Sequence, residues 1–133
     1  MTESPRIALF GIVACDQVRQ ARKWLKEKAL DFDFHDLRKE PPDQTLLLEW
    51  LKHIPHDSLL NRRGQTWRQL PLERRQSVVD QATAVELLLS QPMLIKRPVL
   101  SWGRQLAVGF NADLYENLFS AHLLARSTNS TPT

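Results

Sequence analysis

The spacing of apolar residues changes several times along this chain, and each change predicts a new element. Residues 7–10 are apolar without interruption, which is typical of a strand buried on both faces. From Asp16 onward apolar side chains recur at helical spacing, with charged residues between them, as in an amphipathic helix. Residues 32–37 then alternate between apolar and polar, which indicates a second strand. Because the links are short, this order predicts a crossover unit with a parallel pair of strands.

The middle of the chain, about residues 43–92, shows helical spacing and no strand pattern. Pro41 and Pro42 end the preceding strand pattern, and Asp43 is a candidate N-cap for the first helix of this segment. Asp80 is a candidate N-cap for the last one. Further short helices are expected near residues 56–60, 66–69, 72–79 and 80–90.

Strand spacing returns in the last third of the chain. Residues 99–101 and 105–108 flank a turn that contains Gly103, which predicts a β-hairpin. Asn111 is a candidate N-cap for a final helix. Residues 127–133 are small and polar, and we expect them to be disordered.

The complete order is β-α-β, a helical block, β-β and α. Without the helical block this is the thioredoxin order, so the prediction is an α/β fold: a thioredoxin-like four-stranded mixed sheet with an inserted all-helical subdomain. We expect a single domain over residues 1–126, with the insertion at about 43–92. A chain of 133 residues is long enough to bury a core of this kind.

Composition and charge exclude some functions. The chain is 42% hydrophobic and 25% charged, as ordinary globular proteins are. Its net charge of +3 comes from Lys and Arg scattered among acids, so direct nucleic-acid binding is not expected. No apolar run approaches the roughly 20 residues that span a bilayer, and the first residues do not resemble a signal peptide. Since one cysteine forms no internal disulfide, we expect a cytoplasmic protein without membrane association.

Cys15 is the only cysteine and lies between the first apolar run and the first helix. The N-terminus of a helix offers unpaired N–H groups and a positive partial charge, and both stabilise a thiolate, the nucleophilic form of cysteine. A free cysteine is also often a small buried packing residue. The pattern leaves both interpretations of Cys15 open. The four histidines show no metal-ligand spacing, so neither a metal nor a bound cofactor is expected.

Several segments together resemble a known family. The sequence QPMLIKRPVL at residues 91–100, followed by VGFN at 108–111, is similar to the ArsC/Spx family of arsenate reductases and their relatives. Residues 19–25, after the cysteine, and residues 59–68, LLNRRGQTWR, fit the same family. The resemblance covers about residues 6–120 and is closest to the YffB-like branch of glutathione-dependent thiol reductases.

The resemblance implies roles for individual residues. Pro98 would be a cis-proline that faces the cysteine, and Arg97 would be the anion-binding arginine just before it. A further substrate-binding arginine would be Arg63, with Arg62 as the second choice, because Asn61 stands at the ungapped position of the family's first arginine.

The implied activity is thiol oxidoreduction, with Cys15 as the catalytic nucleophile attacking a disulfide or another small anionic substrate. Glutathione is the expected co-substrate, because the chain has no second thiol, and a glutaredoxin-type protein is a candidate reductant. Arsenate reductases have a His-Asn-Pro loop where this chain has residues 11–14, and a third arginine where it has Val108, which argues against arsenate reduction itself. The alternative is a Spx-like non-enzymatic transcriptional regulator that binds RNA polymerase through residues 43–90. Val18 replaces the second cysteine of the Spx redox switch.

Overall fold

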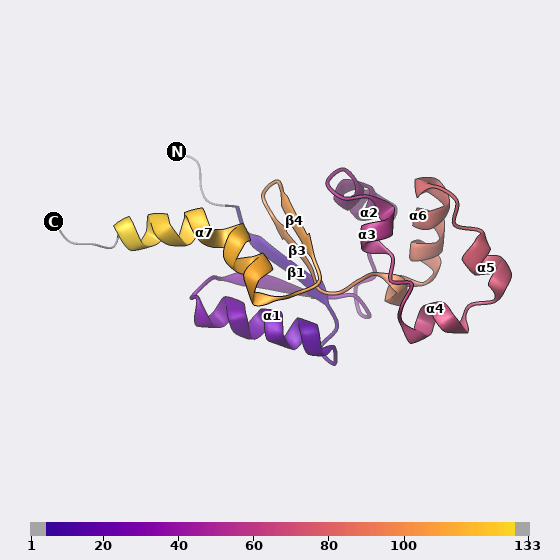
Figure 1. Cartoon of the computed structure of the whole chain (residues 1–133), viewed down its shortest axis with the longest axis horizontal. Coiled ribbons are helices and arrows are strands. Elements are labelled where there is room, and N and C mark those ends of the chain that lie inside the picture. Colours follow the sequence, from indigo (N-terminus) through magenta and orange to yellow (C-terminus); the bar gives the residue numbers. More distant parts are fainter. Residues whose placement is uncertain (1–4, 130–133) are drawn as a thin grey trace.

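The computed structural model describes residues 5–129 of the chain. A mixed sheet with the strand order β2-β1-β3-β4 lies toward one end of the molecule, and a group of short helices lies at the other end (Figure 1). The central strand β1 (Ile7–Gly11) runs parallel to β2 (Phe32–Asp36) and antiparallel to β3 (Val99–Trp102), which pairs with the antiparallel edge strand β4 (Gln105–Val108). This is the thioredoxin-like mixed sheet that the order of elements predicts.

Two longer helices follow strands of the sheet in sequence. The shorter helices form the insertion, which comes between β2 and β3 in the sequence. α1 (Asp16–Glu27) joins β1 to β2, and α7 (Ala112–Asn129) follows β4. Because α7 continues to Asn129, residues 127–129 are helical where a disordered tail was expected; residues 130–133 lie outside the described part. The inserted elements are α2 (Gln44–Leu51), α3 (His56–Leu59), α4 (Gln65–Gln69), α5 (Leu72–Gln76), α6 (Gln81–Ser90) and the 3₁₀ turn η1 (Pro92–Leu94).

The capping residues and the hairpin expected from the sequence are confirmed. The side chains of Asp43, Asp80 and Asn111 each accept a hydrogen bond from the backbone N–H three residues later, at 2.8, 2.9 and 2.7 Å. The β3–β4 turn places Gly103 at φ +59°, a conformation that favours glycine. Local side-chain chemistry therefore sets these helix starts and this turn, which is why the sequence predicts them.

Alternate side chains of β1 enter two separate cores. Ile7 and Leu9 pack in the core formed with α1 and α7, whereas Phe10 packs in the core formed with the helical insertion. Both faces of β1 are thereby covered, which explains its uninterrupted apolar sequence. The first core includes Ala21, Trp24, Leu25, Tyr115 and Phe119, and the second includes Leu47, Trp50, Leu88, Leu94 and Ile95.

The end of β1 approaches the first turn of α1 closely. An ideal Cβ on Gly11 would lie 2.5 Å from Cγ2 of Val18, a buried residue of α1. Carbon atoms in contact are normally about 3.5–4.0 Å apart, so only glycine allows this approach. The absence of a side chain at Gly11 thus fixes how near the N-terminus of α1, and with it Cys15, lies to the sheet.

We predict that Gly11→Ala destabilises the fold, because the added methyl group overlaps Val18. The free energy of unfolding, measured by urea denaturation, should fall by about 1–3 kcal/mol. In Val18→Ala protein the same Gly11 substitution should cost less, with a coupling of at least about 0.5 kcal/mol. Strictly additive effects of the two substitutions would contradict the proposed overlap.

Tyr115, the chain's one tyrosine, belongs to α7 and places its side chain in the core that this helix shares with α1. Its ring meets those of Trp24 and Phe110 edge to face, at centroid distances of 5.5 and 4.7 Å. The hydroxyl is buried and has no hydrogen-bond partner within the described residues. Burial raises the pKa of Tyr115 well above its usual value, because the phenolate would lose its hydration.

We predict that Tyr115→Phe stabilises the protein by up to about 1 kcal/mol, because it removes a buried hydroxyl without a partner. The raised pKa of Tyr115 in the folded state favours folding below the unfolded pKa of about 10, and this contribution is lost as the pH rises above it. Between pH 10 and 12 the wild type should therefore lose stability more steeply than Tyr115→Phe. Parallel curves of unfolding free energy against pH would contradict this.

Candidate functional site

Cys15 is the N-cap of α1. Its backbone is extended, at φ −80° and ψ 127°, and its N–H donates to the carbonyl of Ile12 at 3.2 Å. The carbonyl of Cys15 accepts from the N–H of Arg19 at 3.0 Å, as the first bond of the helix. The thiol itself makes no capping hydrogen bond, and the residue is partly exposed. The sulfur therefore lies at the N-terminus of a helix without taking part in the hydrogen bonds of that helix.

A cavity of about 350 Å³ opens at this thiol. Its lining comes from four parts of the chain: the start of α1, the loop after α3, the segment before β3 and the loop after β4. A volume of this size falls in the range of small-ligand pockets, roughly 300–1,000 Å³. The lining residues are Cys15, Asp16, Gln17, Asn61, Lys96, Arg97 and Gly109.

Arg97 is held in the cavity wall by backbone carbonyls. Its Nη1 donates to the carbonyls of Met93 at 2.8 Å and Ile95 at 3.2 Å. Its Nε is buried and has no partner within the described chain. The Arg97–Pro98 peptide bond is cis, as the resemblance implied, and Arg97 lines the same cavity as Cys15. Because Nη1 is bonded to the chain and Nε is enclosed, Nη2 is the guanidinium nitrogen without a hydrogen bond to the described residues.

A short antiparallel contact ties the insertion to the segment before β3. The N–H of Asn61 donates to the carbonyl of Leu94 at 2.7 Å, and the N–H of Lys96 donates to that of Leu59 at 2.8 Å. These bonds bring Asn61 and Lys96 to the cavity from positions far apart in sequence. The site is therefore built jointly by the sheet and the insertion.

The loop after β4 contributes another part of the cavity wall, through Gly109. Gly109 adopts φ +80°, which favours glycine, and its N–H donates to the carbonyl of Pro98 at 2.8 Å. Next to it, the N–H of Phe110 donates to Oε1 of Gln17 at 3.2 Å. The first turn of α1 is thereby tied to the cis-proline segment. Pro98 takes part through its backbone and is not among the residues that line the cavity.

Arg62 and Arg63, the expected substrate arginines, do not line this cavity. Arg62 donates to Asp57 at 2.6 Å and lies 5.5 Å from the ring centre of Trp67. This hydrogen bond lowers the pKa of the Asp57 carboxyl. The N–H of Arg63 donates to Oδ1 of Asn61 at 3.0 Å. The residue of this loop that lines the cavity is therefore Asn61, whereas the sequence had led us to expect Arg63 or Arg62 there.

Sequence reasoning also missed the other four lining residues, Asp16, Gln17, Lys96 and Gly109. A signal existed for Lys96, since it directly precedes Arg97. Gln17 carries no such signal, because its contact with the loop after β4 exists only in the fold. Asp16 is the acidic residue of the lining, and it forms a salt bridge with Arg19. With Lys96 and Arg97 against Asp16, the lining carries a net positive charge.

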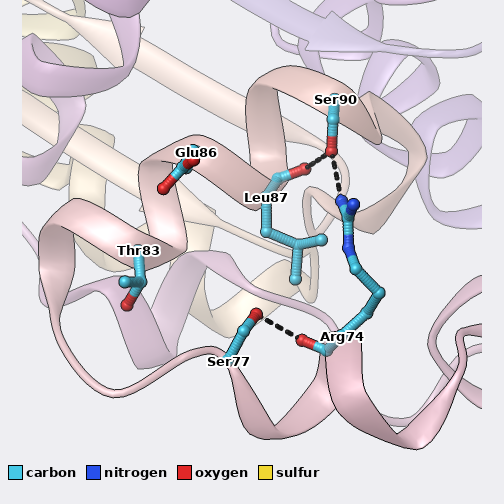
Figure 2. Close-up of a pocket in the computed structure, with 6 residues that line it drawn as sticks. All are labelled: Arg74, Ser77, Thr83, Glu86, Leu87 and Ser90. Atoms are coloured by element: carbon cyan, nitrogen blue, oxygen red, sulfur yellow. Dashed lines mark hydrogen bonds between the residues drawn. The ribbon is translucent and has the colours of Figure 1, made fainter.

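Another cavity, of about 310 Å³, lies between α5 and α6, and several of its polar lining residues are hydrogen-bonded to one another (Figure 2). Arg74 donates to Oγ of Ser90 at 2.9 Å, and Ser90 in turn donates to the carbonyl of Leu87 at 2.9 Å. Oγ of Ser77 donates to the carbonyl of Arg74 at 2.6 Å. The bond from Arg74 to Ser90 joins the two helices, and no thiol lies among the lining residues.

No group of three or more His, Cys, Asp or Glu residues within residues 5–129 could hold a metal ion. No helix in the same range is both long enough and apolar enough to cross a membrane.

Comparisons with known proteins place the site among relatives. The ArsC family model matches residues 10–118. A protein of Haemophilus influenzae is 34% identical over 114 residues, which cover 86% of this chain and 99% of the relative. The solved structure of a YffB protein is 40% identical with a TM-score of 0.79, covering 84% of this chain and 96% of that one. An arsenate reductase (ArsC) related protein from Brucella melitensis is 43% identical with a TM-score of 0.69, covering 90% and 98%.

The matched region carries the whole cavity. Residues 10–118 include Cys15, Asn61 and Arg97, together with the cis-proline. The agreement extends over most of the chain in sequence and in structure. The chain therefore belongs to the ArsC family and is related to arsenate reductases.

Proposed function

We propose that this protein is a thiol oxidoreductase in which Cys15 forms a transient mixed disulfide and glutathione supplies the second thiol. One observation carries the proposal: a thiol that makes no capping hydrogen bond shares a cavity with the guanidinium of Arg97. Membership of the ArsC family supports thiol chemistry at this position.

Three features suit Cys15 to nucleophilic chemistry. The first is its place at the N-terminus of α1, where unpaired N–H groups and the helix dipole stabilise negative charge. The second is the positive charge of Lys96 and Arg97 in the same cavity. The third is the salt bridge from Arg19 to Asp16, which offsets the carboxylate next to the thiol.

The reaction proceeds as two thiol–disulfide exchanges. The Cys15 thiolate attacks the glutathionyl sulfur of a mixed disulfide R–S–S–G, so that Cys15–S–S–G forms and R–S⁻ leaves and takes up a proton. A glutathione thiolate then attacks the glutathionyl sulfur, which forms glutathione disulfide and returns the Cys15 thiolate. The sum is RSSG plus GSH giving RSH plus GSSG. Because the chain has one cysteine, the second step needs a thiol from outside.

The cavity suits glutathione as this outside thiol. Glutathione carries two carboxylates and two peptide carbonyls, and Lys96 and Arg97 offer charged donors to such oxygens. A glutaredoxin-type protein could perform the second exchange instead, since the partly exposed thiol leaves the mixed disulfide open to attack.

Two alternatives have less support. Arsenate bears concentrated negative charge, whereas Arg62 and Arg63 lie outside the lining and leave Lys96 and Arg97 as its positive residues. A Spx-like redox switch needs a second thiol close to the first. Val18 occupies that place and is buried against Gly11.

We predict that Arg97→Ala slows alkylation of Cys15 by iodoacetamide near neutral pH by about three- to tenfold, because a positive charge leaves the cavity. Arg97→Lys should keep much of the rate, since the charge remains while the forked donors are lost. Arg104→Ala, in the exposed β3–β4 turn, is the matched control and should react as the wild type does. An equal rate in wild type and Arg97→Ala would contradict a role of Arg97 at the thiol.

We further predict that native protein incubated with glutathione disulfide gains the mass of one glutathionyl group at Cys15, and that added dithiothreitol removes it. Mass spectrometry of the intact chain and of its peptides measures this, and Cys15→Ser should gain nothing. The same incubation in urea checks that the thiol is competent. If the unfolded chain gains a glutathionyl group and the native protein does not, the proposal is wrong.

A further inference from the structure

Where the insertion meets the segment before β3, the polar groups that line the cavity are mainly hydrogen-bond donors. Oδ1 of Asn61 accepts from the N–H of Arg63 at 3.0 Å, so the acceptor of this amide is already used. Its Nδ2 donates to no residue of the described chain. Lys96 and Arg97, which stand across the short antiparallel contact, are donors only. A ligand between them therefore meets an array that selects oxygen acceptors.

The position of Asn61 is fixed by its surroundings. Its backbone N–H is tied to Leu94, and its side-chain oxygen is tied to Arg63. Gly64 leaves the space that Nδ2 occupies, because an ideal Cβ at Gly64 would lie 2.8 Å from Nδ2. The backbone of Gly64 is extended, at φ −85° and ψ 170°, so any residue could adopt it. An alanine at this position would therefore displace the side-chain amide of Asn61 without straining the backbone.

We propose that Asn61 is a substrate-binding residue whose Nδ2 donates to a carboxylate or peptide carbonyl oxygen of the disulfide, and that Gly64 is its positioning residue. This assigns the site a peptide-bearing disulfide as its substrate class, in place of a compact tetrahedral oxyanion. A neutral amide donor matches a carbonyl or a single carboxylate and adds no charge to balance a multiply charged anion. The proposal rests on the thiol–disulfide chemistry proposed for Cys15.

The test compares two disulfide reagents on the native chain. 5,5′-Dithiobis(2-nitrobenzoate) carries a carboxylate on each half, and 4,4′-dithiodipyridine carries none. The ratio of their rates with Cys15 reports contact with the carboxylate, since a change in thiol reactivity alone affects both reagents. Free glutathione thiol gives the reference ratio. Incubation with glutathione disulfide, followed by mass spectrometry, is run in parallel.

Three variants separate the donor from the fold. Asn61→Ser keeps an oxygen that can accept from the N–H of Arg63, but it removes the amide donor. Asn61→Asp also keeps that acceptor and replaces the donor by a second oxygen. Gly64→Ala leaves both Asn61 atoms in the chain and pushes Nδ2 aside. Asn111→Asp is the matched control, because Asn111 likewise accepts a backbone N–H and does not line the cavity.

We expect the anionic-to-neutral rate ratio to fall about tenfold in Asn61→Ser, as for the loss of one hydrogen bond to a charged group. The fall should be larger in Asn61→Asp and in the same direction in Gly64→Ala, while Asn111→Asp keeps the wild-type ratio. Unfolding curves confirm that each variant is folded.

A wild-type ratio in both Asn61 variants would overturn the assignment of Asn61, even if glutathione adds to Cys15. Shifted ratios without any glutathione adduct would support Asn61 and overturn glutathione as the second thiol. No reaction of Cys15 with either reagent would overturn both proposals.

Discussion

The close approach of β1 to α1 is the constraint on which the rest of the site depends. With no side chain at Gly11, the buried Val18 reaches the end of the strand, and the chain must begin its helix within a few residues. Cys15 is thereby left at the N-cap, with its thiol outside the helix hydrogen bonds. A larger residue at Gly11 would move the helix start, and with it the sulfur, away from the cavity that the other segments form.

The helical insertion is part of the site as well as an addition to the sheet. Through two backbone hydrogen bonds it joins the segment before β3, which carries Lys96, Arg97 and the cis-proline. Its apolar side chains cover the face of β1 opposite α1 and α7, so its position is set by the core and not by a flexible linker. Asn61 consequently stands at a defined place beside the thiol. A domain that lacked the insertion would retain Cys15 and lose one wall of the cavity.

Most of the fold could be predicted because its signals are local. Asp43, Asp80 and Asn111 cap helices through backbone groups three residues away, so their type and position suffice to mark a helix start. The hairpin was equally predictable, since Gly103 supplies the positive φ of the turn. The end of α7 was not. Small polar residues at 127–129 suggested disorder, whereas the helix continues through them to Asn129.

The sequence by itself determined the chemistry that the site could contain: one thiol at a strand–helix junction, one arginine before a proline, and a core patterned for a mixed sheet. Only the tertiary structure decided which side chains share a cavity. It ties the N–H of Asn61 to the carbonyl of Leu94 and brings Gln17 against the loop after β4. The physical reason is the separation along the sequence of the residues that interact. Caps and turns form between neighbouring residues, whereas a cavity wall depends on where packing places segments that are distant along the chain.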